Sequence, residues 1–193
     1  AFLSHLPIDT CLLIDVARIN AYLYSIIQNK KLVQDTSPIT ILKSQKNETE
    51  IANLKNAMIL DGVAILKTQI WLENKLKSET VKETDVAKNL INNISLNKGY
   101  FGESFNTIVG YQANGAIIHY RPEEESCADI KNEGILLVDS GGQYHFGTTD
   151  ITRTWALSMP TAEQKTNYTL VLKGHIQLAT IEFPVGTKGE IGR

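Results

Sequence analysis

The longest regular feature of the sequence is a helical repeat of apolar residues that begins after Asn47. Acidic residues lead this segment, where the dipole of a helix favours negative charge. Apolar side chains then return every three or four residues, the spacing that places them on one face of an α-helix. They are Ile51, Leu54, Met58, Ile59, Val63, Leu66, Ile70 and Leu76. The sequence therefore predicts an amphipathic helix of about 28 residues that buries this face.

Composition limits the kinds of protein that can contain this helix. The chain has 193 residues and 42% hydrophobic content, enough for one full core. Its net charge of -2 creates no field that would attract nucleic acid or an anionic membrane. No apolar stretch approaches the roughly 18 residues of a membrane span. Because Cys11 and Cys127 lack any paired spacing, we expect reduced thiols in a soluble, cytoplasmic protein.

The segment before the long helix has the pattern of a small α/β unit. Residues 11–16 form a short apolar run, and residues 17–28 carry helical spacing. A turn signal at residues 36–38 then separates Leu32 and Val33 from the apolar residues 39–42. These short elements predict a small α/β fragment.

Two further helices are predicted after the long one. Thr84 or Asp85 can cap the first of them. Its apolar positions are Val86, Ala87, Leu90, Ile91 and Ile94. The second begins with a capping box, in which Thr161 and Gln164 satisfy each other's backbone amides, and it ends at Phe183-Pro184.

Between these helices the sequence is rich in β-forming residues. Residues 105–109 and 116–120 predict a pair of strands, and residues 134–139 and 150–157 predict two more. In the last run Ile151, Arg153 and Trp155 alternate with Thr152, Thr154 and Ala156, as in a strand with two different faces. Strands and helices together indicate an α+β fold.

Asp139 and Asp150 are the strongest candidates for chemistry, since each lies at the end of a predicted strand. If residues 141–147 turn the chain, the two strands become antiparallel neighbours and both carboxylates lie at one end of a sheet. Carboxylate oxygens there can bind a divalent ion such as Mg, Mn or Zn. The alternative is a role in the turn alone, because Asp before Ser-Gly-Gly commonly bonds to its own backbone.

The histidines add weaker candidates. His119 ends a β-rich run, where an imidazole can bind a metal or carry a proton near neutral pH, although a lone histidine is more often simply hydrogen-bonded in place. We expect His145, in the Gly-rich turn, to face solvent. We expect His175, on the apolar side of the last helix, to be a core residue with its hydrogen bonds satisfied. The pattern of a nucleophile elbow is absent from the sequence.

Several blocks of the sequence resemble the cytosolic Xaa-Pro aminopeptidases, the aminopeptidase P family. The resemblance implies a pita-bread catalytic domain, which has two similar α+β halves around a pair of divalent ions, commonly manganese, with zinc or cobalt as alternatives. It also implies a homodimeric parent protein. The blocks are residues 46–51, 61–63, 114–120, 137–144, 147–154, 160–165 and 172–176.

The resemblance assigns roles to four residues. Asp139 and Asp150 match the first two metal ligands, and Asp150 bridges both ions. His119 matches a histidine that contacts substrate and helps to move a proton, and Thr152 matches a residue that holds a ligand in orientation. The implied reaction is attack of a metal-bound hydroxide on the carbonyl before proline, in peptides with proline at the second position.

The resemblance also implies an organisation and two alternatives. Residues 1–43 resemble the C-terminal part of a preceding non-catalytic domain, and residues 44–193 resemble the N-terminal half of the pita-bread domain. The family's other ligands, a histidine and two glutamates, would follow residue 193, so we expect this chain alone to be an inactive fragment. A non-catalytic peptide- or protein-binding module of the same fold, or a creatine-type amidinohydrolase, remains an alternative.

Overall fold

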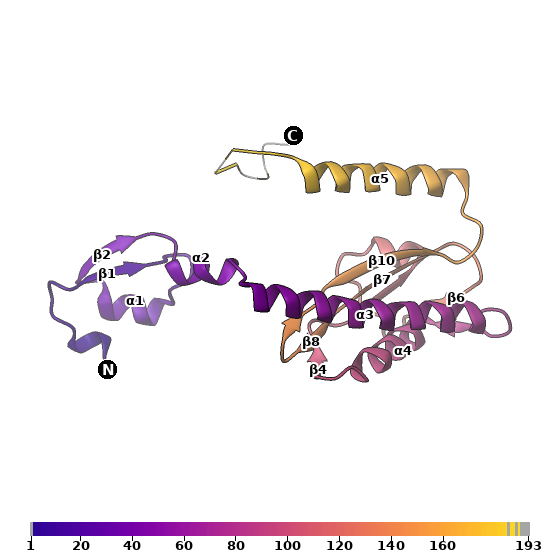
Figure 1. Ribbon diagram of the computed structural model, residues 1–193, viewed down its shortest axis with the longest axis horizontal. Coiled ribbons are helices and arrows are strands. Elements are labelled where there is room, and N and C mark those ends of the chain that lie inside the picture. The colour runs from indigo at the N-terminus through magenta and orange to yellow at the C-terminus, as the bar shows by residue number, and fades with distance from the viewer. Residues whose placement is uncertain (1, 185, 188, 190–193) are drawn as a thin grey trace. The chain divides into compact units, whose positions relative to one another are not determined.

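The computed structural model describes residues 2–184, 186, 187 and 189, and the chain divides into two compact units. The first unit extends to Asn53, and the second begins at Leu54. Figure 1 labels their helices and strands. The long helix α3 (Glu48–Lys75) begins in the first unit and contributes to the core of the second.

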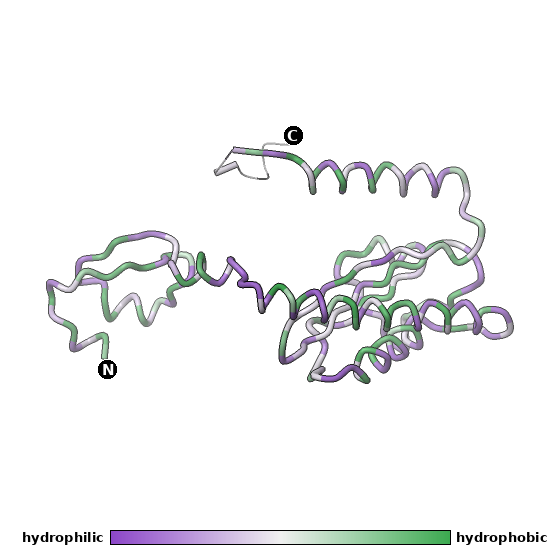
Figure 2. The backbone as a smooth tube through the Cα atoms, viewed as in Figure 1, coloured by the Kyte–Doolittle hydropathy of each residue, from purple (hydrophilic) through white to green (hydrophobic). Residues whose placement is uncertain are grey.

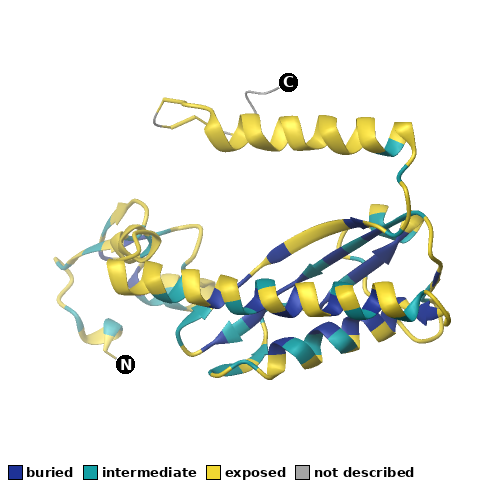
Figure 3. Cartoon of the chain, turned by 45° about the vertical axis from the view of Figure 1, so that its right-hand side comes forward, coloured by how far each residue is buried: buried dark blue, intermediate teal, exposed yellow. Residues whose placement is uncertain are grey.

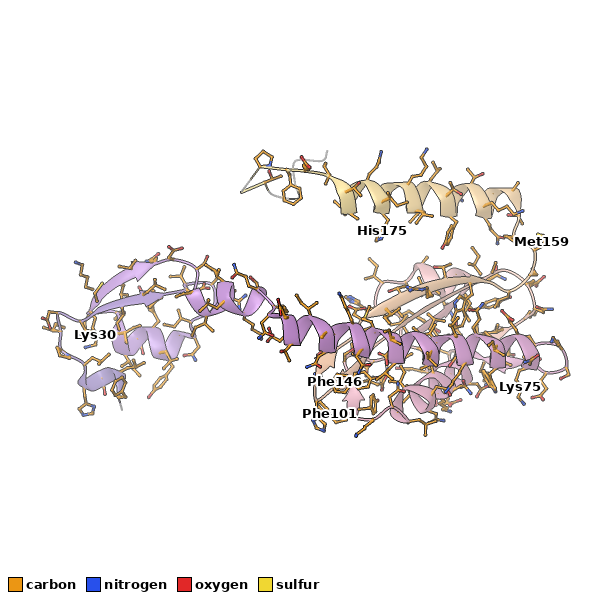
Figure 4. The ribbon with its side chains drawn as sticks, viewed as in Figure 1. Lys30, Lys75, Phe101, Phe146, Met159 and His175 are labelled. Carbon is orange, nitrogen blue, oxygen red and sulfur yellow. The ribbon has the colours of Figure 1, made fainter. Side chains whose placement is uncertain are left out.

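The first unit is a small α/β arrangement, as predicted. Strands β1 and β2 pair in parallel, and α1 connects them. The side chain of Asn20 caps α1 by accepting a hydrogen bond from the amide of Leu23 at 2.8 Å. The amine of Lys30, labelled in Figure 4, donates to the carbonyl oxygen of Leu6 at 2.6 Å. The elements are η1 (Leu3–His5), β1 (Cys11–Ile14), α1 (Ala21–Ile27), β2 (Lys31–Gln34) and α2 (Pro38–Ser44).

Helix α3 has the predicted length of 28 residues, but the prediction of its buried face was wrong. Most of the repeating apolar side chains are exposed, among them Ile59 at 65% and Leu66 at 58%. In Figure 2, hydrophobic and hydrophilic residues alternate along the helix. The buried residues are instead Ala57, Asp61, Ala64, Ile65, Thr68 and Leu72. This face combines the small side chains of Ala57 and Ala64 with the larger Ile65 and Leu72, which all join the core of the second unit.

Helix α4 (Glu83–Ser95) buries the predicted face but begins earlier than predicted. Thr84 and Asp85 lie within its first turn and do not precede it. Asp85 accepts a hydrogen bond from the amide of Lys82 at 3.0 Å, and so satisfies a free amide at the helix start from inside the helix. Of the predicted apolar positions, Ile91 is half-buried and the others are buried, namely Val86, Ala87, Leu90 and Ile94.

The main sheet of the second unit has three antiparallel strands in the order β10–β7–β5. Thr152 pairs with Asp139, so the predicted pairing of the two aspartate-bearing strands is confirmed. Helices α3 and α4 cover one face of this sheet (Figure 1), where Leu136, Val138 and Trp155 join the core. The strands are β5 (Ile108–Tyr111), β7 (Ile135–Ser140) and β10 (Ile151–Ala156).

The strand predicted at residues 116–120 does not form. After β5, which begins later than the predicted run 105–109, the chain enters the 3₁₀ helix η2 (Gln112–Ala116) and then a turn. His119 has φ 57, a left-handed conformation that interrupts an extended chain. Local β-propensity is overridden here because a buried carboxylate, that of Glu83, binds residues of this loop.

Two strands between Asp139 and Asp150 in sequence join the earlier strand β4 in a second small sheet. Its strands pair antiparallel in the order β4–β8–β9, so residues 141–149 form a hairpin outside the main sheet and not a simple turn. Its aromatic side chains stack, Phe101 on His145 and Phe146 on Tyr144. Figure 4 labels Phe101 and Phe146. The strands are β4 (Tyr100–Glu103), β8 (Gly142–Tyr144) and β9 (Gly147–Thr148), and β3 (Val81–Lys82) pairs separately with β6 (Asp129–Ile130).

Helix α5 (Ala162–Thr180) has the predicted capping box but lacks the predicted burial. The hydroxyl of Thr161 accepts from the amide of Gln164 at 3.1 Å, and Gln164 Oε1 accepts from the amide of Thr161 at 2.9 Å. Figure 3 shows α5 exposed along almost its whole length. His175 is therefore exposed and not a core residue, because the apolar side of α5 does not join the core of the described chain.

Candidate metal centre

Asp139 and Asp150 lie at the same end of the main sheet, as predicted. Asp139 is near the end of β7, and Asp150 immediately precedes Ile151, which pairs with Ser140. Ser140 is buried on the face that α3 and α4 cover. Because side chains alternate along a strand, Asp139 and its partner Thr152 project from the opposite, uncovered face. Asp139 is half-buried, and Asp150 is exposed.

Thr152 holds the Asp139 carboxylate in a defined orientation. Its hydroxyl donates a hydrogen bond to Asp139 Oδ1 at 2.8 Å. The bond follows from the register, since the two residues are directly opposed on one face of the sheet. Asp139 Oδ2 accepts no hydrogen bond within the described chain, so it can bind a cation.

The chemistry of these side chains fits part of a divalent-metal site. Neither Asp139 nor Asp150 forms an ion pair with a lysine or arginine of the described residues. The neighbouring Arg153 instead donates to the carbonyl oxygen of Thr152 at 2.7 Å. Carboxylate oxygens without a counter-charge are suitable ligands for hard divalent ions. Within residues 2–184, 186, 187 and 189, no group of three or more candidate metal ligands comes together.

Between the two aspartates, the backbone at Gly141 lies very close to the backbone at Thr149. A Cβ added at Gly141 would lie 2.1 Å from the carbonyl oxygen of Thr149. Ser104 is hydrogen-bonded to both backbone segments. Its hydroxyl donates to the Thr149 carbonyl at 2.8 Å, and its amide donates to the Gly141 carbonyl at 3.0 Å. Glycine at 141 is therefore needed for close approach of two backbones.

His119 lies on a loop beside the same face of the sheet. A Cβ at Gly115 would lie 3.5 Å from the side chain of Leu137, which shares that face with Asp139. The His119 side chain is exposed and forms no hydrogen bond to either aspartate in the described part of the chain. His145 is exposed as predicted. The structure thus places Gly115 of this loop against Leu137, whereas no contact of His119 with Asp139 or Asp150 is found among the described residues.

Sequence reasoning missed two buried carboxylates near this site. Asp61 in α3 is 1% exposed, and Glu83 at the start of α4 is 0% exposed. The sequence signal for Asp61 was its position four residues after Ala57 and four before Ile65 on one helix face, but the choice of that face was wrong. Neither residue forms an ion pair within the described residues, so hydrogen bonds alone satisfy them.

Glu83 organises the loop that carries His119. Its carboxylate accepts hydrogen bonds from the amides of Tyr111 at 2.6 Å and Ala128 at 2.9 Å. It also accepts from Asn114 Nδ2 at 3.1 Å and from the Tyr120 hydroxyl at 2.7 Å. Burial, together with the hydrogen bond to Glu83, raises the pKa of Tyr120 above its usual range, so this hydroxyl remains a donor. Glu83 thereby joins both ends of residues 111–128.

Comparison with known proteins bears on this partial site. Residues 52–192 match the model of metallopeptidase family M24, which is more than half of the chain. Aminopeptidase P2 of Arabidopsis thaliana is 46% identical over 154 residues, which cover 79% of this chain and 22% of that protein. A probable Xaa-Pro aminopeptidase P of Sordaria macrospora is 46% identical over 155 residues, which cover 79% of this chain and 25% of that protein.

A solved structure shares the fold. The X-prolyl aminopeptidase of Caenorhabditis elegans, described as a cytosolic enzyme with a dinuclear active site, is 33% identical with a TM-score of 0.83. The match covers 95% of this chain and 30% of that one, so the chain spans less than a third of the length of these relatives. The expected α+β fold of the pita-bread type is confirmed. In the described part of the chain, no helix has the length and apolarity needed to cross a membrane.

Proposed function

This chain belongs to metallopeptidase family M24, and on that premise we propose that it forms part of an enzyme that removes the N-terminal residue from peptides with proline at the second position. The observation that carries the proposal is the pair Asp139 and Asp150 at one end of the main sheet, with Thr152 orienting the first of them. The names of the similar proteins support this choice of substrate.

We propose that the two domains follow the expected division. Residues 1–43 would be the C-terminal part of a non-catalytic domain, and residues 44–193 the N-terminal half of the catalytic one. The match of residues 52–192 to the family supports this division, as does the separate α/β arrangement of the first unit.

The proposed cofactor is a pair of divalent ions, with manganese preferred and zinc or cobalt as alternatives. Asp139 and Asp150 would be ligands, and Asp150 would bridge the pair. When bound, such ions supply an activated water and polarise the scissile carbonyl. The hydrogen bond from Thr152 to Asp139 Oδ1 would hold that carboxylate ready before binding, since ligands fixed by neighbouring hydrogen bonds bind metals more tightly.

The proposed role of His119 is contact with substrate and transfer of a proton. An imidazole can accept and return a proton near neutral pH. The Glu83 carboxylate anchors Asn114 and Tyr120 on either side of His119, so the loop has a defined position while the imidazole itself is free to meet a peptide.

We propose that the 193-residue chain alone does not catalyse this reaction, because two carboxylates are fewer than a dinuclear site requires. The complete protein would act as a cytoplasmic homodimer, without a nucleic-acid or membrane partner. A non-catalytic binding module of this fold would bind such peptides without cleaving them. A creatine-type amidinohydrolase would cleave creatine instead.

The test is the release of the first residue from an Xaa-Pro peptide by the complete protein that contains this sequence. We expect cleavage that a chelator abolishes and added Mn²⁺ restores. A matched peptide with alanine in place of proline should be a poor substrate. Binding without cleavage, or cleavage of creatine alone, would overturn the proposal in favour of the corresponding alternative.

A further inference from the structure

Asp61 is a buried carboxylate in the middle of helix α3, and no metal-ligand role is proposed for it. It is 1% exposed and has no lysine or arginine partner in the described chain. A buried carboxylate is unfavourable unless hydrogen bonds satisfy it. The groups that donate hydrogen bonds to Asp61 therefore indicate its structural role.

All the donors to Asp61 come from the segment between the two proposed ligands. Asp61 Oδ1 accepts a short hydrogen bond from the hydroxyl of Tyr144. Asp61 Oδ2 accepts one from the hydroxyl of Thr149 and another from the amide of Gly142 at 3.2 Å. Burial, and then the hydrogen bond to Asp61, raises the pKa of Tyr144 above its usual range, so Tyr144 remains a donor.

Gly142 and Thr149, at the two ends of the hairpin, are hydrogen-bonded to Asp61 and also to each other. The amide of Gly142 also donates to the Thr149 hydroxyl at 2.7 Å, and the amide of Thr149 donates to the Gly142 carbonyl at 3.0 Å. Thr149 directly precedes Asp150, and Gly142 lies three residues after Asp139. A Cβ at Gly142 would lie 2.8 Å from Tyr144 Cε2, 3.1 Å from Ile94 Cγ2 and 3.2 Å from Asp61 Oδ2, so the space around this residue is tightly filled.

We infer that Asp61 is a positioning residue for the metal centre, which fixes both ends of the hairpin so that Asp139 and Asp150 are presented together. The inference rests on the proposed function. Asp61 touches neither aspartate, and it acts through Gly142 and Thr149. Serial hydrogen bonds of this kind set the geometry of ligands before a metal binds.

A matched control separates this role from general support of the fold. Thr68 lies on the same buried face of α3 and is 0% exposed. Its hydroxyl accepts from Asn93 Nδ2 at 3.0 Å, and thereby joins α3 to α4 without contacting the hairpin. Thr68→Val thus removes a buried polar contact of α3 that does not lead to the aspartates.

The experiment compares Asp61→Ala, Asp61→Asn and Thr68→Val in the complete protein. The Kd for Mn²⁺ is measured by competition with a fluorescent chelator, and hydrogen exchange of the Gly142 and Thr149 amides is followed without metal. We expect Asp61→Ala to weaken Mn²⁺ binding by about 10- to 100-fold and to speed exchange at both amides. Asp61→Asn, which keeps one acceptor oxygen and the side-chain shape, should weaken binding by about 10-fold and provides the test if the alanine variant does not fold. Thr68→Val should leave the Kd within about twofold of wild type, since ligand orientation is unchanged.

The outcomes distinguish the two claims. If the wild type binds Mn²⁺ and the folded Asp61 variants bind it equally well, the positioning role is wrong while the proposed function stands. The same conclusion follows if Thr68→Val weakens binding as much as the Asp61 variants do. If the wild type binds no divalent ion, the proposed function is wrong and the inference fails with it.

Discussion

At the scale of single residues, the Thr152 hydroxyl links strand pairing to the proposed chemistry. It lies opposite Asp139 and donates to one carboxylate oxygen. The other oxygen accepts no hydrogen bond from the described residues and can bind an ion. The pairing of Thr152 with Asp139 in the sheet thus sets the orientation of the carboxylate that is proposed as a ligand.

We predict that Thr152→Val weakens Mn²⁺ binding by the complete protein about 10-fold, because Asp139 loses the donor that orients it. Unfolding stability should change by less than about 0.5 kcal/mol, since the residue is exposed. Thr154→Val is the control, because Thr154 lies on the same face of β10 opposite Leu137. Isothermal titration calorimetry and urea unfolding measure both effects, and equal affinities of the two variants would contradict the prediction.

We predict that Glu83→Ala lowers the free energy of unfolding by about 3 kcal/mol, because several buried donors lose their acceptor. The control is Glu79→Ala, which removes an exposed carboxylate paired with Lys75 and should change stability by less than about 1 kcal/mol. Urea unfolding of both variants checks this. A loss below about 1 kcal/mol for Glu83→Ala would show that water replaces the carboxylate.

Residue patterns could place Asp139 and Asp150 at one end of a sheet, but they could not identify Asp61 or Glu83 as buried carboxylates. The position of the first pair could be predicted because each aspartate lies at the end of a predicted strand, with several glycines between the two. The other two depend on which helix face is buried and which loop meets it. Those contacts join residues far apart in the chain, such as Asp61 with Thr149, and no local pattern records them.

At the scale of elements, the β8–β9 hairpin determines how the two aspartates are joined. It was expected as a simple turn, but it leaves the main sheet and pairs with β4. The hairpin begins at Gly141, whose backbone lies very close to the carbonyl oxygen of Thr149. Any side chain at residue 141 would force these backbones apart.

We predict that Gly141→Ala destabilises the protein by about 2 kcal/mol, because its Cβ would overlap the Thr149 carbonyl, 2.1 Å away. Gly62→Ala in α3 is the matched control. Its Cβ meets nothing within 4 Å, and alanine favours helix, so we expect stabilisation by about 0.5–1 kcal/mol. Thermal unfolding monitored by circular dichroism compares them. If Gly141→Ala were as stable as wild type, the backbones at Gly141 and Thr149 could separate at little cost in free energy, and the prediction would be wrong.

Element positions followed from local signals more reliably than packing did. Periodicity predicted α3, a capping box with periodicity predicted α5, β-rich composition predicted β7, and alternation predicted β10. Periodicity failed to identify the buried face of α3, because large apolar residues occur on more than one face of this helix: Ile65 and Leu72 are buried, whereas Ile59 and Leu66 are exposed. It also failed for residues 116–120, where contacts with Glu83 override β-propensity.

At the scale of the whole molecule, family membership helps to choose between two interpretations of Asp139 and Asp150. Two carboxylates at one end of a sheet are compatible with a turn or with a metal site, and no third candidate ligand joins them among the described residues. The match of residues 52–192 to metallopeptidase family M24 favours the metal site. The chain spans less than a third of the length of its relatives.

The most direct test of the metal site is the stoichiometry of Mn²⁺ bound to the complete protein, compared with its Asp139→Asn and Asp150→Asn variants. The account predicts two ions per wild-type chain. Asp139→Asn should weaken one of them, and Asp150→Asn should weaken both, because Asp150 is proposed to bridge the pair. Circular dichroism should show that both variants stay folded, since Asp150 is exposed and Asp139 is only half-buried. Two ions bound with unchanged affinity in both variants would contradict the assignment of these aspartates as ligands.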